Sequence, residues 1–161
     1  MIDYDYTFDV FKLTSKFYED YPKDDYPELM DKDSRPYNCL LIETADYIMA
    51  IPYRTKLNPS NKDCYRFKKS ARSINNNSGL DYQKMVIVSD SDYLEATGYS
   101  IDNDEYLETV ENIKRIVDEA VTYVRNYVTH HTVKPMNKHD YQRAYRFTTL
   151  QYFHKELGLE K

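Results

Sequence analysis

The chain has 161 residues, of which 41% are hydrophobic and 15% aromatic, and a formal net charge of −5. This composition excludes a disordered chain, and no apolar run approaches the ~20 residues that a membrane span requires. A single domain over residues 1–161 is expected, because this length supports one sizeable core. Cys39 and Cys64 form no disulfide framework and the N-terminus lacks a secretory pattern, so we expect a soluble cytoplasmic protein with free thiols.

The N-terminal part predicts a strand, a short helix and a loop. The pattern over residues 7–14 is typical of a strand. Ser15 is a suitable N-cap for a brief helix over residues 16–21, which Pro22 stops. Residues 22–36 are rich in charge and proline, which predicts a surface loop.

Two apolar runs, residues 37–43 and 47–51, predict a β-hairpin because only three residues separate them. Their near-continuous apolarity indicates burial on both faces, as in a small closed or strongly curved antiparallel sheet. Pro52 is expected to end the pairing of the second strand.

Weaker patterns follow the hairpin. Residues 64–68 alternate polar and aromatic side chains like a half-exposed strand, and residues 85–88 predict a short buried one. Between them, residues 73–81 have the Asn, Ser and Gly content of a flexible loop. Its last four residues, SGLD, either form a turn that fixes the next strand or place Asp81 where it orients a cation.

From Asp102 the spacing of apolar residues becomes that of a helix, with Asp104 as a suitable cap. One long amphipathic helix reaching Val128 is therefore expected. A second helix is predicted over residues 137–157, with Gly158 just past its end. Short strands followed by segregated helices give an α+β domain, and the strand count suits a small barrel or a curved half-barrel.

The positive charges are concentrated in two segments of an otherwise acidic chain. Residues 54–72 carry seven Lys or Arg against the single acid Asp63, and residues 133–161 carry six against three. Such a concentration is typical of a polyanion site, because phosphate contacts supply much of the affinity for nucleic acid. A solvated basic loop that balances acidic neighbours explains it equally well.

Several familiar sites are poorly supported by the spacing of their residues. The four histidines lack the HExxH spacing, and the two cysteines lie far from any CxxC pattern. Three glycines cannot supply a Walker loop or a dinucleotide fingerprint, and the acids of DKD and DSD stand in turn-rich contexts. We therefore expect no metal and no cofactor.

The end of the hairpin carries the most informative cluster. In a hairpin of this length Arg35 and the triplet Arg54, Thr55 and Lys56 lie at the same edge of the sheet. Three cations and a hydroxyl group are expected to meet there. The cations repel one another unless an anion binds between them, and an RNA phosphate is the natural candidate. The alternative is that Arg54, Thr55 and Lys56 are ordinary exposed turn residues, which composition alone slightly favours.

The segments FKLTSKFYEDYP, SRPYNCLLIE, YIMAIPYRTK, CYRFKKS and SGLDYQKMVIV, followed by a long helix, occur in this order. Over roughly residues 8–130 the chain resembles the endoribonuclease toxins of type III toxin–antitoxin systems, the ToxN/AbiQ superfamily, and particularly its TenpN- and CptN-like branches. The resemblance implies a compact, strongly curved antiparallel sheet or small barrel, similar to MazF/Kid-type toxins. A short N-terminal helix and long C-terminal helices accompany that sheet.

The resemblance also implies partners and a role. A repeat-encoded, pseudoknot-like antitoxin RNA is processed by the toxin and then blocks its active site, often in a closed protein–RNA ring. Cellular messenger RNA is the other substrate, and such systems act in phage abortive infection or plasmid maintenance. No membrane and no DNA partner is expected.

The positions that match the family's active site are Arg35, Arg54, Thr55, Lys56 and, in the N-terminal helix, Tyr18 in preference to Phe17. ToxN-type toxins carry adjacent hydroxyl residues followed by lysine, whereas this chain has Arg-Thr-Lys. The proton donor for the leaving 5′ oxygen therefore stays open between Lys56 and Tyr18, with Arg54 and Thr55 holding the phosphate.

The leading hypothesis is a metal-independent endoribonuclease that leaves a 2′,3′-cyclic phosphate and a 5′-hydroxyl group. The alternatives are a non-catalytic module that binds single-stranded RNA, and an interaction protein with a tyrosine-rich surface. The candidate RNA contacts are Lys16, Lys62, Tyr65, Arg66, Lys68, Lys69, Arg72, Ser78 and Lys134. For Tyr65 and Phe67, cross-strand packing is the more common role at alternate strand positions.

Overall fold

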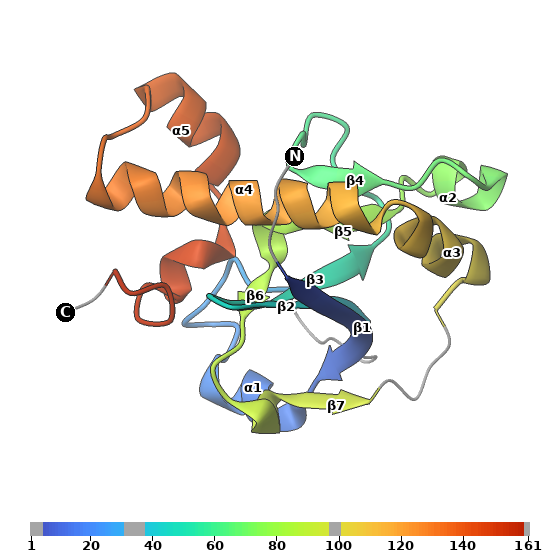
Figure 1. Ribbon diagram of the computed structural model, residues 1–161, viewed down its shortest axis with the longest axis horizontal. Coiled ribbons are helices and arrows are strands. Elements are labelled where there is room, and N and C mark those ends of the chain that lie inside the picture. The colour runs from blue at the N-terminus through green and yellow to red at the C-terminus, as the bar shows by residue number, and fades with distance from the viewer. Residues whose placement is uncertain (1–4, 31–37, 97–100, 160–161) are drawn as a thin grey trace.

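A computed structural model describes residues 5–30, 38–96 and 101–159, and these form an α+β fold around one seven-stranded antiparallel sheet (Figure 1). The strands are β1 (Tyr6–Leu13), β2 (Cys39–Thr44), β3 (Ile48–Arg54), β4 (Cys64–Arg66), β5 (Gly79–Asp81), β6 (Val86–Ile87) and β7 (Leu94–Ala96). Their order is β4-β5-β3-β2-β1-β7, and β6 pairs with β3 off this path. The path is open, because β4 and β7 at its two ends are not paired with each other.

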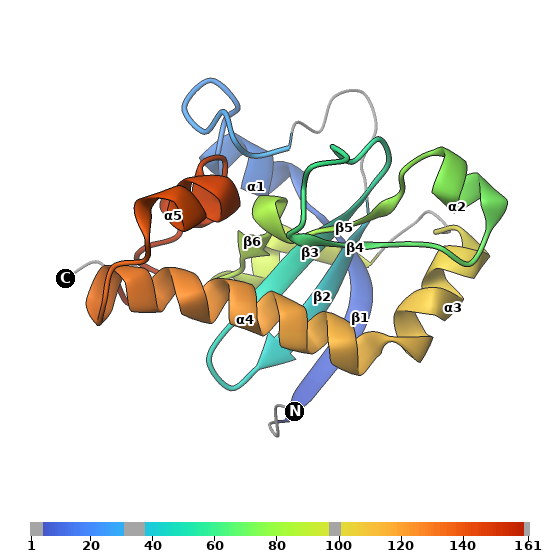
Figure 2. The same ribbon diagram turned by 90° about the horizontal axis from the view of Figure 1, so that it is seen from above.

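α4 runs across the sheet in both ribbon views, and α1 lies on the side of the central strands away from α4 (Figures 1 and 2). The helices are α1 (Ser15–Asp20), α2 (Ala71–Asn75), α3 (Asn103–Glu111), α4 (Ile113–Thr132) and α5 (Lys138–Tyr145), with 3-10 turns η1 (Tyr82–Lys84), η2 (Ser91–Tyr93) and η3 (Thr149–Tyr152). The inner face of α4 buries Ile116, Val117, Ala120 and Val124 in the core. Over the described ranges, none of the helices combines the length and the apolarity that crossing a bilayer requires.

The predicted hairpin is confirmed. β2 and β3 pair antiparallel, with Cys39 opposite Pro52 and Glu43 opposite Ile48. Met49, Ala50 and Ile51 are fully buried, as their apolarity predicts. Both cysteines are free thiols, also as expected.

Pro52 does not end the strand, contrary to prediction, because β3 continues to Arg54. The Tyr53 N–H donates to the Asn38 carbonyl on the β2 side at 3.0 Å, so the backbone of Pro52 faces the opposite edge of β3. Proline has no N–H to offer that edge. It therefore interrupts the ladder on one side only.

The partner strand bends away at this interruption. Ala50 of β3 pairs with Val86 of β6, and Tyr53 pairs with Leu80 of β5. Between these two pairs, β3 has two residues, whereas the segment that joins β5 to β6 has five, residues 81–85. The extra residues form the 3-10 turn η1, which consequently lies beside the end of β3.

Two segments differ from the helices that the sequence predicts. The expected single helix from Asp102 is broken at Asn112, whose side-chain amide donates to the Glu108 carbonyl at 2.9 Å. Its N-cap is Asp102 rather than Asp104, since the Asp102 carboxylate accepts from the Glu105 N–H. The second helix ends at Tyr145 instead of residue 157, and Thr148 caps the separate turn η3.

Residues 73–81 are not a flexible loop. The Ser70 hydroxyl accepts from the Ser73 N–H at 3.1 Å and caps the short helix α2. Gly79–Asp81 then forms β5, which lies between β3 and β4. Three-residue strands show too little alternation for a sequence pattern to reveal them.

Candidate anion-binding site

Arg54 at the end of β3 is held by a buried carboxylate. Its Nη1 atom donates to Oδ2 of Asp81 at 2.7 Å, and the Asp81 side chain is only 2% exposed. The other oxygen of Asp81, Oδ1, accepts from the Asn61 side chain at 3.2 Å and from the Gln83 N–H at 3.0 Å. The alternative in which Asp81 orients a cation is therefore confirmed, and the expectation that only an incoming anion balances the charges at this strand end is wrong.

The register of the sheet explains this pairing. Arg54 lies opposite Gly79, and Gly79 lies opposite Arg66 on the far side of β5. Asp81 is two residues along β5 and hence on the same face as Arg54, at the diagonal position. The opposite face of these strands carries Leu80 and Tyr65, both buried in the core.

Part of the Arg54 side chain is accessible to a ligand. The side chain is 30% exposed, and beyond its contact with Asp81 it has no hydrogen bond to another described residue. A guanidinium has five N–H donors in a planar fork, so one anchored nitrogen leaves donors directed outward. Such an anchored fork is suited to an oxyanion.

Thr55 and Lys56 follow Arg54 directly and are both exposed. Lys56 has a φ of 56°, in the left-handed region that costs a non-glycine residue free energy. The Lys56 N–H donates to the Asn76 carbonyl at 2.7 Å and the Leu57 N–H donates to the Asn77 carbonyl at 3.0 Å. These bonds hold the turn, so the hydroxyl and the amine project from a fixed backbone.

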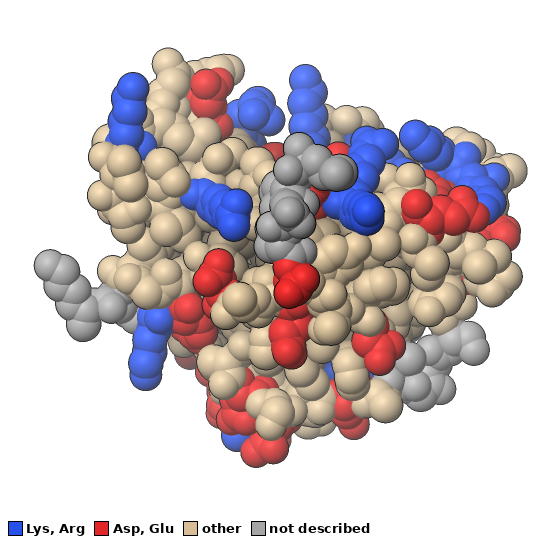
Figure 3. Space-filling model, viewed as in Figure 1, with Lys and Arg blue, Asp and Glu red and all other residues tan. Residues whose placement is uncertain are grey.

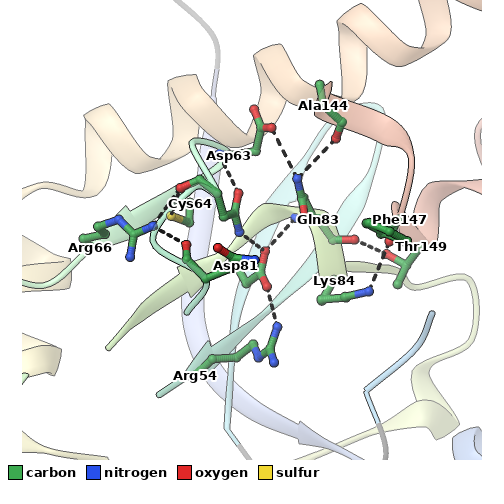
Figure 4. A network of polar contacts seen from close by, with 12 residues as sticks. Arg54, Asp63, Cys64, Arg66, Asp81, Gln83, Lys84, Ala144, Phe147 and Thr149 are labelled. Carbon is green, nitrogen blue, oxygen red and sulfur yellow. Dashed lines mark hydrogen bonds and ion pairs between the residues drawn. The ribbon is translucent and has the colours of Figure 1, made fainter. Parts of the chain in front are cut away.

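Lys84 joins this group, and the sequence analysis did not identify it. Asp81 caps η1 through the Gln83 N–H, and Lys84 is the last residue of that turn. Its Nζ donates to the Phe147 carbonyl oxygen at 3.1 Å (Figure 4). Burial lowers the pKa of Lys84; the charge of Asp81 acts in the opposite direction and the charge of Arg54 reinforces the lowering.

We expect the substitution Asp81→Asn to destabilise the fold by about 1–3 kcal/mol, because it removes the charge that Arg54 binds while keeping the shape of the side chain. Urea unfolding followed by circular dichroism measures this. Asp46→Asn, at an exposed position in the β2–β3 turn, is the matched control and should leave the midpoint unchanged. A midpoint for Asp81→Asn equal to wild type would mean that this ion pair does not stabilise the native state.

Several predicted RNA contacts are already engaged by other groups of the same chain, most of them acids. Lys69 pairs with Glu111, and Arg72 pairs with Asp102. Lys16 donates to Asp90 at 2.9 Å and lies 3.6 Å from Asp92. Arg66 donates from Nη2 to the carbonyl groups of Asn58 and Asn61 at 2.7 and 2.8 Å.

Two predicted RNA contacts are buried and are removed from the candidate surface. Ser78 is 2% exposed and Tyr65 is also 2% exposed, so the Tyr65 ring has no free face for a base. Tyr65 instead packs edge-on against Phe67, with ring centres 5.7 Å apart, which is the packing alternative. Its hydroxyl donates to Glu108 at 2.7 Å.

The remaining predicted residues are dispersed. Lys62 and Lys68 are exposed and form no ion pair with a described acid. Lys134 follows α4 at the end farther from α2 (Figures 1 and 2). Tyr18 is half-buried on α1, and Arg35 lies outside the described residues.

The surface charges are unevenly distributed. In the view of Figure 3 most Lys and Arg side chains lie on the side of the molecule that carries β4, α2 and α5, whereas acids predominate toward α1 and β7. Some acids stand among the cations, in agreement with the pairs that Lys69 and Arg72 form. Acidic side chains of the same chain therefore neutralise part of the positive charge on the predicted polyanion surface.

No family model, no curated protein and no solved structure matched this chain in the three comparisons.

Proposed function

We propose that this chain is a metal-independent endoribonuclease that cuts RNA by attack of the 2′-hydroxyl group on the adjacent phosphorus. The observation that supports it most is the fixed guanidinium of Arg54, anchored by Asp81 at 2.7 Å with donors left over and followed directly by exposed Thr55 and Lys56. An oriented fork beside a hydroxyl and an amine suits a phosphate whose negative charge increases in the transition state.

The chemistry needs little else from the protein. RNA supplies its own nucleophile, so the 2′ oxygen forms a bond to phosphorus while the bond to the 5′ oxygen breaks. Alignment, charge neutralisation and proton transfer are then sufficient. The products are a 2′,3′-cyclic phosphate and a 5′-hydroxyl group.

The resemblance to the ToxN/AbiQ superfamily extends this proposal to a biological role. The protein would be the cytoplasmic toxin of a type III toxin–antitoxin system, with messenger RNA as target. A folded, repeat-encoded RNA would be both substrate and inhibitor, in a closed protein–RNA ring. The same proposal includes a structural similarity between this antiparallel sheet and the small barrel of MazF/Kid-type toxins.

The test is cleavage of a mixed-sequence RNA in EDTA by purified protein. The double variant Thr55→Ala, Lys56→Ala is expected to cut about 100-fold more slowly than wild type, because two groups that face the transition-state charge are lost. The matched control is Lys138→Ala, another exposed lysine, which should keep the wild-type rate. Direct phosphorylation of the downstream product by a polynucleotide kinase identifies its 5′-hydroxyl group.

A double variant as fast as wild type would exclude this site. RNA that is bound tightly but stays intact over prolonged incubation would favour the second candidate, a non-catalytic module for single-stranded RNA. Exposed Lys62 and Lys68, free of ion pairs with the described acids, are the observation in its favour. Backbone phosphates are the ligands that such lysines bind.

A further inference from the structure

Lys84 is placed by three different parts of the chain. It ends the 3-10 turn η1, whose start is capped by Asp81, the carboxylate that also holds Arg54. Its side chain is half-buried, and its Nζ donates to the Phe147 carbonyl oxygen at 3.1 Å in a solvent-exposed hydrogen bond. In Figure 4 the Arg54 guanidinium and the Lys84 amine both extend from the region around Asp81. The hydrogen bond to Phe147 thus gives the amine a defined position, and the charge of the anchored guanidinium acts on it.

The segment around Phe147, which accepts the hydrogen bond from Lys84, is itself held in place. The Thr149 hydroxyl donates to the Gln83 carbonyl at 3.2 Å and also to the Met85 carbonyl, one residue to either side of Lys84. Leu150, in the same turn, is fully buried. Hydrogen bonds therefore hold both η1, which carries Lys84, and the segment whose carbonyl accepts from it. The amine consequently has little conformational freedom.

Charged groups from three parts of the chain act on the Lys84 amine. Asp81 comes from β5 and Arg54 from β3, while Lys23 and Glu28 come from the segment that follows α1. Burial has the largest effect and lowers the pKa; the two carboxylates raise it and the two cations lower it further. A lower pKa makes the ammonium group a stronger acid.

We propose that Lys84 is the catalytic acid of the reaction, donating its proton to the 5′ oxygen of the leaving nucleotide while Arg54 holds the phosphate. This rests on the proposed endoribonuclease function. As the 2′ oxygen bonds to phosphorus, the bond from phosphorus to the 5′ oxygen breaks and its electron pair takes the proton from Nζ. The proton of the 2′-hydroxyl group passes to water, and the neutral Lys84 amine is reprotonated from solvent.

The geometry favours Lys84 over the two donors that the sequence leaves open. Lys56 is exposed, and its amine makes no hydrogen bond or ion pair with a described residue, so no described group fixes its direction. Tyr18 lies on α1. Thr14, the residue before this helix, donates hydrogen bonds to the carbonyl groups of Asp92 and Tyr93, which places α1 beside the segment that leads into β7. Of the two lysines, Lys84 is the one whose amine is held by a hydrogen bond to a described residue, and the charge of Arg54 acts on it.

The experiment compares Lys84→Met and Lys84→Arg with wild type on two RNA substrates in EDTA. One substrate has the natural 5′ oxygen at the scissile bond, and the other has sulfur in that bridging position, which leaves as a thiolate without needing a proton. Both variants should cut the oxygen substrate about 100-fold more slowly in single turnover. They should cut the sulfur substrate at a rate within about threefold of wild type. A variant that is slow on the oxygen substrate but normal on the sulfur substrate has lost the group that protonates the leaving oxygen.

Three further readouts separate chemistry from structure. The affinity for a 2′-deoxy analogue should be nearly unchanged in Lys84→Arg, which keeps the charge. The fall of the wild-type rate at high pH, where Lys84 loses its proton, should be absent from both variants. Lys138→Met, on exposed α5, should behave as wild type on both substrates.

The outcomes are distinguishable. Wild-type protein that leaves RNA intact would overturn the endoribonuclease and Lys84 together. Wild-type cleavage with Lys84→Met equally fast on the oxygen substrate would overturn Lys84 alone. An equal loss on the oxygen and sulfur substrates would also overturn it, because proton donation would then not be what the lysine supplies.

Discussion

Replacing Gly79 by alanine is expected to destabilise the protein by about 3 kcal/mol or more, since backbone cannot move aside as a side chain can. Gly79 lies between two neighbouring strands, opposite Arg54 of β3 and Arg66 of β4. A Cβ atom at this position would overlap the Tyr65 carbonyl oxygen and lie 2.6 Å from Cδ1 of Leu57. Equilibrium urea unfolding measures the loss.

The matched control is Gly158→Ala, which separates crowding from backbone conformation. Gly158 has a φ of +75° but nothing within 4 Å of an added Cβ. Its replacement should cost only about 1 kcal/mol, the ordinary penalty for a side chain in the left-handed region. A Gly79→Ala variant no less stable than Gly158→Ala would show that β4 and β5 do not approach this closely.

Removing the Glu108 side chain is expected to cost about 3–5 kcal/mol, because Glu108→Ala leaves the buried Tyr65 hydroxyl and two partly buried N–H groups without an acceptor. Glu108 is 4% exposed although it is charged. Its carboxylate accepts from the Tyr65 hydroxyl at 2.7 Å, from the Lys68 N–H at 3.0 and 3.1 Å, and from the Lys69 N–H at 2.9 Å. This one side chain ties α3 to the end of β4.

Chemical unfolding of three variants tests that role. Glu108→Gln keeps an acceptor oxygen and should lose less than half of what Glu108→Ala loses. Glu111→Ala, which removes an exposed carboxylate paired with Lys69 one helical turn away, should change stability by less than about 1 kcal/mol. Equal effects of Glu108→Ala and Glu111→Ala would contradict the anchoring role.

The hairpin and the core face of α4 could be predicted because burial leaves a direct pattern in the residues. Ile42 and Ile51 stand in continuous apolar runs, and Ile116 and Val124 recur at helical steps. The break at Asn112 has no such signal. Glu108, four residues before the break, bonds to Tyr65 and Lys68, which are 43 and 40 residues away in the sequence, and no local pattern indicates such contacts.

The candidate site was predictable only in part. Arg54, Thr55 and Lys56 follow an apolar strand, which predicts a strand end, and the nearby SGLD segment suggested an orienting role for Asp81. Lys84 could not be selected from the sequence, because it resembles the other lysines until the fold brings Phe147 to it. The acids that pair with Lys69 and Arg72 are Glu111 in α3 and Asp102 at its N-cap. They are too far away in the sequence for a local pattern to predict these pairs.

The contacts that assemble the site also bear on when it forms. Arg54 and Asp81 are 27 residues apart in the chain, and Lys84 and Phe147 are 63 apart. Closing such long loops is slow compared with forming a hairpin, and a chain emerging from a ribosome cannot make a contact whose second partner is not yet synthesised. A growing chain would therefore complete its hairpin early and acquire the fixed amine only after the segment around Phe147 had been made, so nascent chains would carry an unfinished site.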